Sequence, residues 1–485
     1  MRRLATFLLI AASVVGIVLV ETRDSPPEEG ASLALVSLSG YPQATETARI
    51  STSWFCPGAA AGDGITSASV VISNPGDTEM KAAISFLGSG ESESDSVVVP
   101  ARSRESYDIL RGLGVGVVAP VVEIVGSVGS VEQRIEFAAG NVTSQCASQT
   151  SPTWYFADGH TLEGSKHRLV LVNPFPESAV VNVSFTTLDG ERNPSSLQGL
   201  ILPARSARSI SLTESGARDE RRIAVEVRAT TGQIVASRIQ HYLGGGRLGY
   251  STTLGNPVPL AEYWFASGRT GANLTEQLIA FNPGEEDVTL NIAFFGDGIT
   301  GGGDPSEGEV EPLPNAQVTV AAGAIQAIST DEIADLPKGD HSMFVSVVDG
   351  GGIVVEHVLS QSIGRSFFTA ITNGIPGPLV SRKWLVPTGV AEGSDNLLSV
   401  LNASNDAGTI TVFAVGPGGT VAVPELTDVP LAAAQLLTIE PPESARIAEL
   451  LITSSVPLVV QRRTSRGSTL VGFGIVGALP VRVAR

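Results

Sequence analysis

Short apolar stretches with a period of two residues recur along this chain and predict β-strands. In the clearest of them Val181, Val183 and Phe185 alternate with the polar residues Asn182 and Ser184. Such alternation places one face of a strand in a core and the other face in solvent. Four segments of this kind end in a phenylalanine, at Phe86, Phe185, Phe294 and Phe413.

A second recurring pattern is an apolar run that ends in asparagine. These runs cover residues 70–74, 169–173, 278–282 and 397–402. Proline follows the asparagine in the first three, and alanine follows it in the fourth. An asparagine side chain bonds to its local backbone and proline fixes the next φ angle, so each run is predicted to be a strand that ends in a tight turn.

Both patterns follow a tryptophan phrase that repeats at domain length. The phrases read W-F-C-P-G, W-Y-F-A-D-G, W-F-A-S-G and W-L-V-P-T-G. They begin at Trp54, Trp154, Trp264 and Trp384. Because the spacing of 100, 110 and 120 residues is that of a domain and not of a solenoid repeat, the phrases count four related domains. We expect the four rings to pack in the repeat cores and not to form a ligand platform.

Several strands and antiparallel turns per repeat predict an all-β fold of four tandem Ig-like β-sandwiches, arranged as a rod or a cluster. A β-propeller is the alternative, with two blades for each repeat. Helix is expected to be minor, near residues 330–336 and 443–450. The expected divisions are a membrane anchor or signal segment at 1–23, a linker at 24–47, and repeats at 48–150, 151–258, 259–378 and 379–485.

The N-terminus has a different character from the rest of the chain. Arg2 and Arg3 precede 17 uncharged residues at positions 4–20, and acidic residues follow. A helix of this length reaches roughly 25 Å, close to the ~30 Å thickness of a membrane core. The segment is predicted to be a single-pass anchor in the cell membrane, with the bulk of the chain extracytoplasmic because positive residues stay inside. A secreted protein with a cleaved signal is the alternative.

Composition narrows the function classes. The net charge is −18, from 49 acidic and 31 basic residues, and no basic stripe is present. A nucleic-acid partner is therefore not expected, because neutralising phosphates requires clustered lysine and arginine. The sequence contains no nucleophile elbow, Walker loop or H-E-x-x-H motif, and we expect no enzyme activity, no cofactor and no metal.

The two cysteines bracket the first repeat. Cys56 lies in the first tryptophan phrase and Cys146 lies eight residues before the second. They would meet if the first and last segments of that domain are neighbours, and we predict a disulfide, which suits an oxidising compartment. Two free buried thiols are the alternative.

Three groups of residues could carry chemistry. The first is a possible metal-ligand set in repeat 2, but its spacing fits neither a helix nor a strand face, so a polar loop is favoured. The second is a group of alternating arginines that could meet an anionic polymer, although a solvated strand face is favoured. The third is the acidic loop 297–309, a weak candidate for Ca²⁺. The members of the first two groups are Asp158, His160, Glu163 and His167, and Arg102, Arg104, Arg205 and Arg208.

The phrase W-Y-F-A-D-G-H-T from Trp154, followed by L-V-L-V-N-P-F-P and L-P-A-R-S-A-R-S-I, resembles repeats of actinobacterial envelope proteins in a domain-of-unknown-function family. The resemblance covers nearly everything after about residue 50, and it is strongest in repeat 2. It implies a location in the cell envelope and a repeated β-architecture. It supplies no reaction and no binding residues.

These observations together predict a non-enzymatic, membrane-anchored extracytoplasmic repeat protein that acts as an envelope scaffold, spacer or adhesion module. The alternative is a carbohydrate- or polymer-binding protein that supports biosynthesis of the cell envelope. The expected partners are the membrane, through residues 4–20, and an envelope glycan or another envelope protein.

Overall fold

In the computed structural model, the described residues are 38, 40–45, 49–88, 93–296, 299, 315–387, 395–446, 448–465 and 472–482. The expected membrane anchor at 1–23, most of the linker and all of the acidic loop 297–309 except Ile299 therefore lie outside the described residues. Among the residues that are described, no helix is long and apolar enough to cross a membrane.

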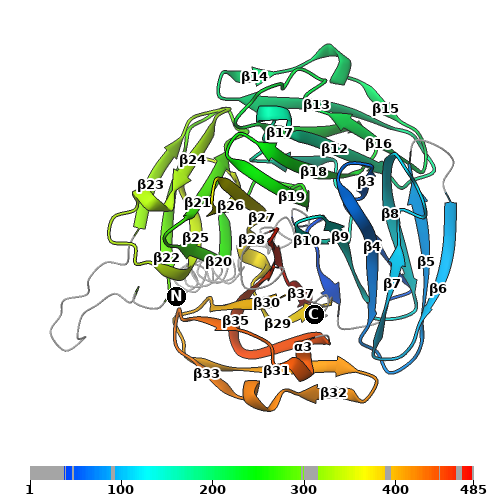
Figure 1. Cartoon of the computed structure of the whole chain (residues 1–485), viewed down its shortest axis with the longest axis vertical. Coiled ribbons are helices and arrows are strands. Elements are labelled where there is room, and N and C mark those ends of the chain that lie inside the picture. Colours follow the sequence, from blue (N-terminus) through cyan, green and yellow to red (C-terminus); the bar gives the residue numbers. More distant parts are fainter. Residues whose placement is uncertain are drawn as a thin grey trace, which may run out of the picture. The chain divides into compact units, whose positions relative to one another are not determined.

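The chain from Gly40 to Arg485 forms one compact unit built from four antiparallel β-sandwiches, which we call modules 1 to 4. Each module has an inner and an outer sheet (Figure 1). The sandwich, and not the propeller, is therefore the architecture of each repeat.

In module 1 a strand that ends in the tryptophan phrase starts the outer sheet, and the chain then passes between the outer and the inner sheet. The outer sheet comprises β2 (Ser51–Phe55), β8 (Gly116–Val125), β5 (Met80–Leu87) and β6 (Glu93–Val99), with β3 (Ala59–Ala61) beside β8. The inner sheet comprises β10 (Gly140–Gln145), β9 (Ser130–Phe137), β4 (Ile65–Asn74) and β7 (Ser103–Asp108).

Modules 2 and 3 repeat this arrangement. In module 2 the outer sheet has β11 (Thr153–Phe156), β17 (Ala224–Thr231), β13 (Ala179–Thr187), β14 (Gly190–Arg192) and β15 (Leu200–Leu202). Its inner strands are β19 (Arg247–Leu254), β18 (Val235–Gly244), β12 (Lys166–Asn173) and β16 (Ser206–Ser211). In module 3 the outer sheet has β28 (Ile375–Pro376), β20 (Glu262–Thr270), β25 (Gly339–Asp349), β22 (Val288–Phe295) and β23 (Asn315–Val320), and the inner strands are β27 (Ser366–Asn373), β26 (Val354–Ile363), β21 (Leu274–Phe281) and β24 (Ile325–Ser329).

Module 4 uses one long strand, β35 (Glu449–Ser465), in both of its sheets. Its outer strands are β29 (Ser381–Val386), β31 (Gly408–Gly416), β32 (Gly419–Ala422), β33 (Val429–Leu431) and β37 (Leu479–Arg482), and its inner strands are β30 (Asp395–Asn402), β34 (Leu436–Ile439) and β36 (Gly474–Gly477). The short helices are η1 (Leu162–Gly164), η2 (Ser195–Leu197), η3 (Thr330–Glu332), η4 (Gly377–Leu379), η5 (Pro424–Leu426) and α3 (Glu443–Arg446).

The four inner edge strands β10, β19, β27 and β36 bring the modules together. Each of them contacts two others in the order β10, β19, β27, β36 and back to β10. The contact between β19 and β27 includes a parallel bridge from Leu248 to Phe368. The modules therefore follow one another in a closed cycle, and the expected tandem array is a cluster and not a rod.

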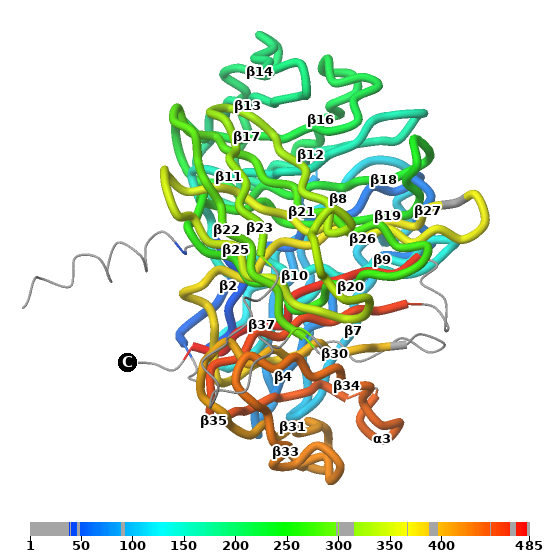
Figure 2. Tube along the Cα trace, turned by 90° about the vertical axis from the view of Figure 1, so that its left-hand side faces the viewer, coloured from blue at the N-terminus to red at the C-terminus, as the bar shows by residue number. Residues whose placement is uncertain are grey.

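The first and the last of the described strands close this cycle. The short strand β1 (Ala44–Thr45), which precedes module 1, pairs in parallel with β37 of module 4. In Figure 2 the red and orange strands of module 4 lie beside the blue strands of module 1. We call each contact surface between neighbouring modules a seam, and we name it by its two modules.

The asparagine that ends each predicted run has the same role in every module. Asn74 accepts a hydrogen bond from Gly76 N, and its side-chain amide donates to the carbonyls of Thr78, Val99 and Pro100. Asn173, Asn282 and Asn402 repeat this arrangement. One side chain thus holds two turns together, which explains why the asparagine is kept where the following proline is not.

Three of the four tryptophans lie in the module cores. Trp54, Trp154 and Trp384 are at most 2% exposed, and the Trp154 indole donates to the carbonyl of Ile234 at 3.0 Å. Trp264 differs from the prediction, because it is only partly buried. Tyr263 takes the buried position and donates its hydroxyl hydrogen to Ile353 O at 3.0 Å. A shift of one residue in a strand turns a side chain to the opposite face.

The disulfide between Cys56 and Cys146 is present. It joins the tryptophan phrase to the residue after β10. The bridges that pair Phe55 with Ala147 and Tyr155 with Asn256 align this pair with Phe156 and Gly255 in module 2. There the Phe156 ring lies so close to Gly255 that a Cβ atom on the glycine would be 2.9 Å from it. A large ring over a glycine thus fills the space that the disulfide fills in module 1.

Candidate functional site: the seams between modules

The central strand of each inner sheet, β9, β18, β26 or β35, places two successive polar residues at the seams. The strand registers align these pairs as Glu132–Gln133, Ser237–Arg238, Glu356–His357 and Gln461–Arg462. Successive strand residues point to opposite faces. The first residue of a pair therefore faces the preceding module, and the second faces its own tryptophan phrase.

In modules 2, 3 and 4 the first residue of the pair binds backbone at the end of the preceding module's tryptophan phrase. Ser237 Oγ donates to Pro57 O at 2.6 Å. Glu356 Oε2 accepts from Asp158 N at 2.8 Å. Gln461 Oε1 accepts from Ala266 N at 2.7 Å and from Ser267 N at 2.9 Å. The repeated phrase is thus a docking segment for the next module as well as part of a core.

In modules 1 and 2 the second residue of the pair binds the tryptophan phrase of its own module. The Gln133 amide donates to Gly58 O at 2.7 Å and accepts from Gly58 N at 2.8 Å. The Arg238 guanidinium donates to Asp158 O. Buried backbone groups need such partners, so these side chains fix the phrase in the shape that the neighbouring module contacts.

Two seams carry a buried ion pair between these positions. Arg238 of module 2 contacts Glu356 of module 3 at 3.0 and 3.2 Å. Arg462 of module 4 contacts Glu132 of module 1 at 3.0 Å. All four side chains are at most 2% exposed. Burial lowers the pKa of Arg238, but the Glu356 carboxylate outweighs burial and raises it, so the guanidinium stays charged.

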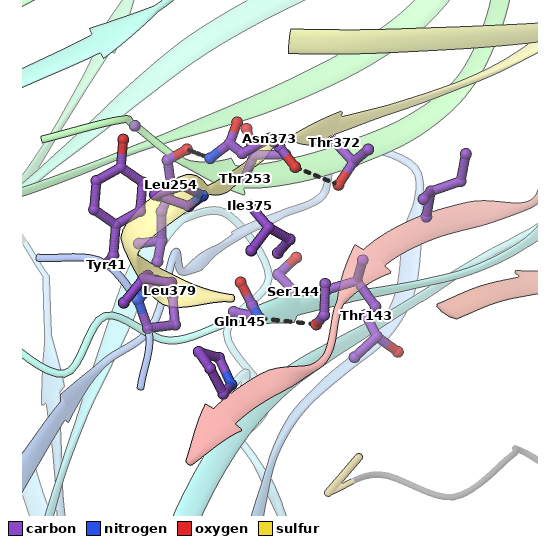
Figure 3. A pocket seen from close by; sticks show the side chains of 18 of the residues that line it. Tyr41, Thr143, Ser144, Gln145, Thr253, Leu254, Thr372, Asn373, Ile375 and Leu379 are labelled. Carbon is purple, nitrogen blue, oxygen red and sulfur yellow. Dashed lines mark hydrogen bonds between the residues drawn. The ribbon is translucent and has the colours of Figure 1, made fainter. Parts of the chain in front are cut away.

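The same two seams carry a side-chain amide on the edge strand that caps a carbonyl of the preceding module. Gln145 donates to Gly477 O at 2.8 Å and to Ala478 O at 2.9 Å. Asn373 donates to Leu254 O at 2.9 Å, and both amides are drawn in Figure 3. The 2–3 and 4–1 seams therefore share an ion pair and an amide cap.

A small pocket with both polar and apolar walls lies where the four edge strands meet (Figure 3). Its volume is about 50 Å³, and its wall includes Tyr41, Thr143, Thr252 and Asn373. The buried atoms Thr252 Oγ1 and Asn373 Oδ1 have no hydrogen-bond partner among the described residues. A space of this size suits a few water molecules, and it is far below the volume of an ordinary ligand pocket.

The 1–2 seam is held by a different charge arrangement. Asp63 of module 1 forms an ion pair with Lys166 of module 2 and lies 3.6 Å from His241 Nδ1. Burial raises the pKa of Asp63, but the nearby His241 and Lys166 outweigh it and lower the pKa to about 2. The carboxylate is therefore ionised at any ordinary pH.

The possible metal ligands of repeat 2 do not converge. Asp158 is buried and contacts Arg247 at 2.5 Å, and His160 bonds to Gly244 O at 3.0 Å. Glu163 accepts a hydrogen bond from Gly245 N at 2.8 Å. Burial and then Arg238 lower the pKa of His167 to about 3. Within the described part of the chain, no group of three such side chains could hold a metal ion.

The four arginines proposed for an anionic polymer are also separated by the structure. Arg102 pairs with the exposed Asp77, and Arg205 sits in a left-handed turn at φ 48°. Arg208 is exposed on β16, whereas Arg104 points into the 4–1 seam and donates to Pro387 O at 3.3 Å. They do not form one surface.

Sequence reasoning missed a buried cluster in module 3. Glu276 contacts His357 at 2.7 Å and His341 at 2.8 Å, and it accepts a hydrogen bond from Arg269 N at 2.9 Å. Burial raises the pKa of Glu276, but the two histidines outweigh burial and lower it. The three residues come from β21, β25 and β26, and their separation in sequence leaves no local motif that could have revealed them.

Trp264 belongs to an aromatic group outside the core. Its ring stacks on Phe344 at a centroid distance of 4.2 Å and lies 5.9 Å from Phe295. All three side chains are partly buried. This group is the part of the tryptophan set that retains contact with solvent.

Comparison with known proteins places the chain in a family without assigning a function. No curated protein matches it. Among solved structures, the Thermotoga maritima protein 1070 is 13% identical with a TM-score of 0.20, and the match covers 24% of this chain and 95% of that one. A Streptomyces avermitilis alpha-L-rhamnosidase complexed with L-rhamnose is 8% identical with a TM-score of 0.16, over 73% of this chain and 46% of the other.

The model of one family matches residues 136–246 and 257–471, which together exceed half of the chain. The matched segments run from β9 of module 1 to the end of β35. They include the tryptophan phrases of modules 2, 3 and 4 and three of the four central strands in full. The chain belongs to this family, the Family of unknown function (DUF5719).

Proposed function

We propose that this protein is a non-enzymatic scaffold of the cell envelope, held at the membrane by residues 4–20, in which the four modules act as one body. The observation that carries the proposal is that two of the seams contain buried ion pairs. Arg238 and Glu356 pair across one seam, and Arg462 and Glu132 pair across another, each with full burial. Modules joined through buried contacts hold their binding surfaces at fixed relative positions, and a scaffold requires such fixed positions.

Two features support an extracytoplasmic location. The Cys56–Cys146 disulfide suits an oxidising compartment. The uncharged segment 4–20 after Arg2 and Arg3 is the pattern of a membrane anchor with its positive end inside. The modules follow one another in a closed cycle and not in a rod, so a scaffold is favoured over a long spacer.

In-cell capture with the full chain tests the scaffold. A photoreactive amino acid is placed at one exposed outer-sheet position in each module, with the buried Val183 as the matched control. The four positions are Val98, Ile201, Val348 and Val421. We expect identified envelope proteins to be captured from at least one exposed position and none from Val183. Capture of cytoplasmic proteins alone, or of no envelope component from any position, would contradict the proposal.

A second candidate function is glycan binding at the aromatic group of module 3. Trp54, Trp154 and Trp384 are enclosed, whereas Trp264 is partly open beside Phe344 and Phe295. Aromatic faces of this kind can stack on sugar rings. We expect Trp264→Ala to weaken binding of purified envelope polysaccharide roughly tenfold, while Val348→Ala on the same sheet leaves it unchanged. Equal affinity of the two variants would remove this candidate.

A further inference from the structure

The 4–1 seam differs from the other three because it joins the two ends of the chain. Successive modules are otherwise connected by a linker that continues from the inner edge strand into the next tryptophan phrase. At the 4–1 seam the backbone connection is replaced by the pairing of β1 with β37, from Ala44 to Val481 and from Thr45 to Arg482. Among the described residues, no linker therefore tethers module 4 to module 1 at this seam.

The 4–1 seam also contains a buried carboxyl at a position where the other modules have none. Glu449 is the first residue of β35 and is 2% exposed. The pairing of the tryptophan strand with its neighbour aligns it with Ala119 in module 1, Ala224 in module 2 and Ser342 in module 3. Three modules thus place a small, uncharged side chain against the next module, and module 4 places a glutamic acid there.

Glu449 is packed against module 1. Ser73 of β4 donates its hydroxyl hydrogen to Glu449 Oε2, and Ser73 is fully buried. Glu449 Oε1 has no hydrogen-bond partner among the described residues. An ionised carboxylate with one oxygen unpaired in a buried seam costs far more than the protonated acid does.

The charged groups around Glu449 come from three strands. Arg104 of β7 favours its ionised form, and Glu132 of β9 opposes it. Glu132 is itself paired with Arg462 of β35 at 3.0 Å, and Arg134 of β9 lies near Arg104. Burial is the largest effect and raises the pKa of Glu449 to about 7, against the smaller lowering effects of Ser73 and Arg104.

We propose that the 4–1 seam is a proton-controlled joint, which is closed while Glu449 is protonated and loosens when this carboxyl ionises. The direction follows from linkage. The pKa of Glu449 is higher in the closed seam than its ordinary value of 4.5, so the stabilisation is complete below pH 4.5 and is lost as the pH rises toward 7. Above pH 7 this group causes no further change.

Thiol labelling measures the opening. The two native cysteines form a disulfide, so one introduced cysteine is the only free thiol in the full chain. Leu385→Cys reports on the 4–1 seam, because Leu385 of module 4 packs into the apolar cluster of modules 1 and 2. Val354→Cys is the matched control, since Val354 packs in the 2–3 seam. The ratio of the two labelling rates at each pH cancels the ionisation of the thiol itself.

We expect this ratio to rise at least tenfold between pH 5 and pH 8, where a pKa difference between 4.5 and about 7 permits up to roughly 300-fold. In the Glu449→Gln background the ratio is expected to stay within twofold. A ratio that does not change with pH would overturn the proposal, and so would an equal rise in the Glu449→Gln protein.

A second variant guards against misfolding of the first. Glu449→Ala installs the residue that modules 1 and 2 carry at this position, Ala119 and Ala224, and it should also remove the pH dependence. Hydrogen exchange of the unlabelled full chain gives an independent measurement. After correction for intrinsic rates, β4 and β35 are expected to exchange faster at pH 8 than at pH 5, whereas β18 and β26 are not. Equal changes in all four strands would contradict a joint located at the 4–1 seam.

Discussion

The 2–3 seam and the 4–1 seam contain the same buried ion pair and the same amide cap, in two different settings. Each has an arginine on one central strand, a glutamate on the next and an amide cap on the edge strand. The 2–3 seam connects modules that are consecutive in the chain, and Ala224 faces its partner there. The 4–1 seam connects the two ends of the chain, and Glu449 takes the corresponding place.

This difference separates the residues that build the cycle from those that make one seam responsive to its surroundings. Shared residues such as Arg238 and Arg462 maintain the arrangement, because removing either leaves a glutamate buried without its cation. Glu449 is not needed for the ion pair or the amide cap, since the 2–3 seam forms both without a glutamate at the corresponding position. A repeated architecture can thus acquire a sensitive joint through one substitution at the seam where no linker holds the modules together.

The largest expected effect comes from removing the buried ion pair of the 2–3 seam. Arg238→Met should lower the free energy of unfolding by about 3–5 kcal/mol, because Glu356 remains buried without its partner. Chemical denaturation measures the loss. Arg228→Met on the same module is the control, and it should cost little because its ion pair with Glu226 is exposed. Similar losses in the two variants would show that the seam pair has no special role.

A smaller effect is expected at the residue that directly follows the inner edge strand, where modules 2 and 4 differ. Gly255 precedes the linker of the 2–3 seam, and a Cβ atom there would lie 2.9 Å from the Phe156 ring. Gly255→Ala should cost about 1–3 kcal/mol through overpacking. The reverse change at the matching position of module 4, Ala478→Gly, should cost less than about 1 kcal/mol. Thermal unfolding of both variants checks the order, and a larger loss for Ala478→Gly would contradict the alignment of these positions.

The smallest effect concerns acid, to which the 1–2 and 4–1 seams should respond in opposite directions. The folded pKa of Asp63 is about 2, below its ordinary value of 3.8, so its stabilisation is present above pH 3.8 and is lost as the pH falls toward 2. We expect Asp63→Asn to cost about 1 kcal/mol at pH 7, after allowance for the partly exposed Lys166, and only a small fraction of that at pH 2. Unfolding at both pH values tests this, and an equal cost at pH 2 would contradict an electrostatic origin.

The sequence alone predicted what depends on local pattern. The alternation around Phe185, the turn after Asn173 and the return of Trp154 in each repeat indicated β-sandwiches and their number. Cys56 and Cys146 indicated a disulfide because they bracket one repeat. These predictions succeed because strands, turns and a closing crosslink are encoded within a single repeat.

The seams could not be predicted, because their partners lie far apart in the chain. Arg238 and Glu356 are 118 residues apart, and Arg462 and Glu132 are 330 apart. The central strands also carry different residues at equivalent positions, such as Gln133, Arg238 and His357, so the repeat shows no common motif there. The prediction that Trp264 packs in a core was wrong for a related reason. A shift of one residue exchanges it with Tyr263 and leaves the phrase recognisable.

A double-mutant cycle across the 4–1 seam tests the central claim, that the first and last modules meet through the Arg462–Glu132 pair. The free energy of unfolding is measured for the wild-type protein, for Arg462→Met, for Glu132→Leu and for the double variant. We predict that each single change is strongly destabilising, that the double variant loses much less than their sum, and that the coupling is about 2 kcal/mol or more. Strictly additive losses would show that these residues do not meet, and the closed cycle would be wrong.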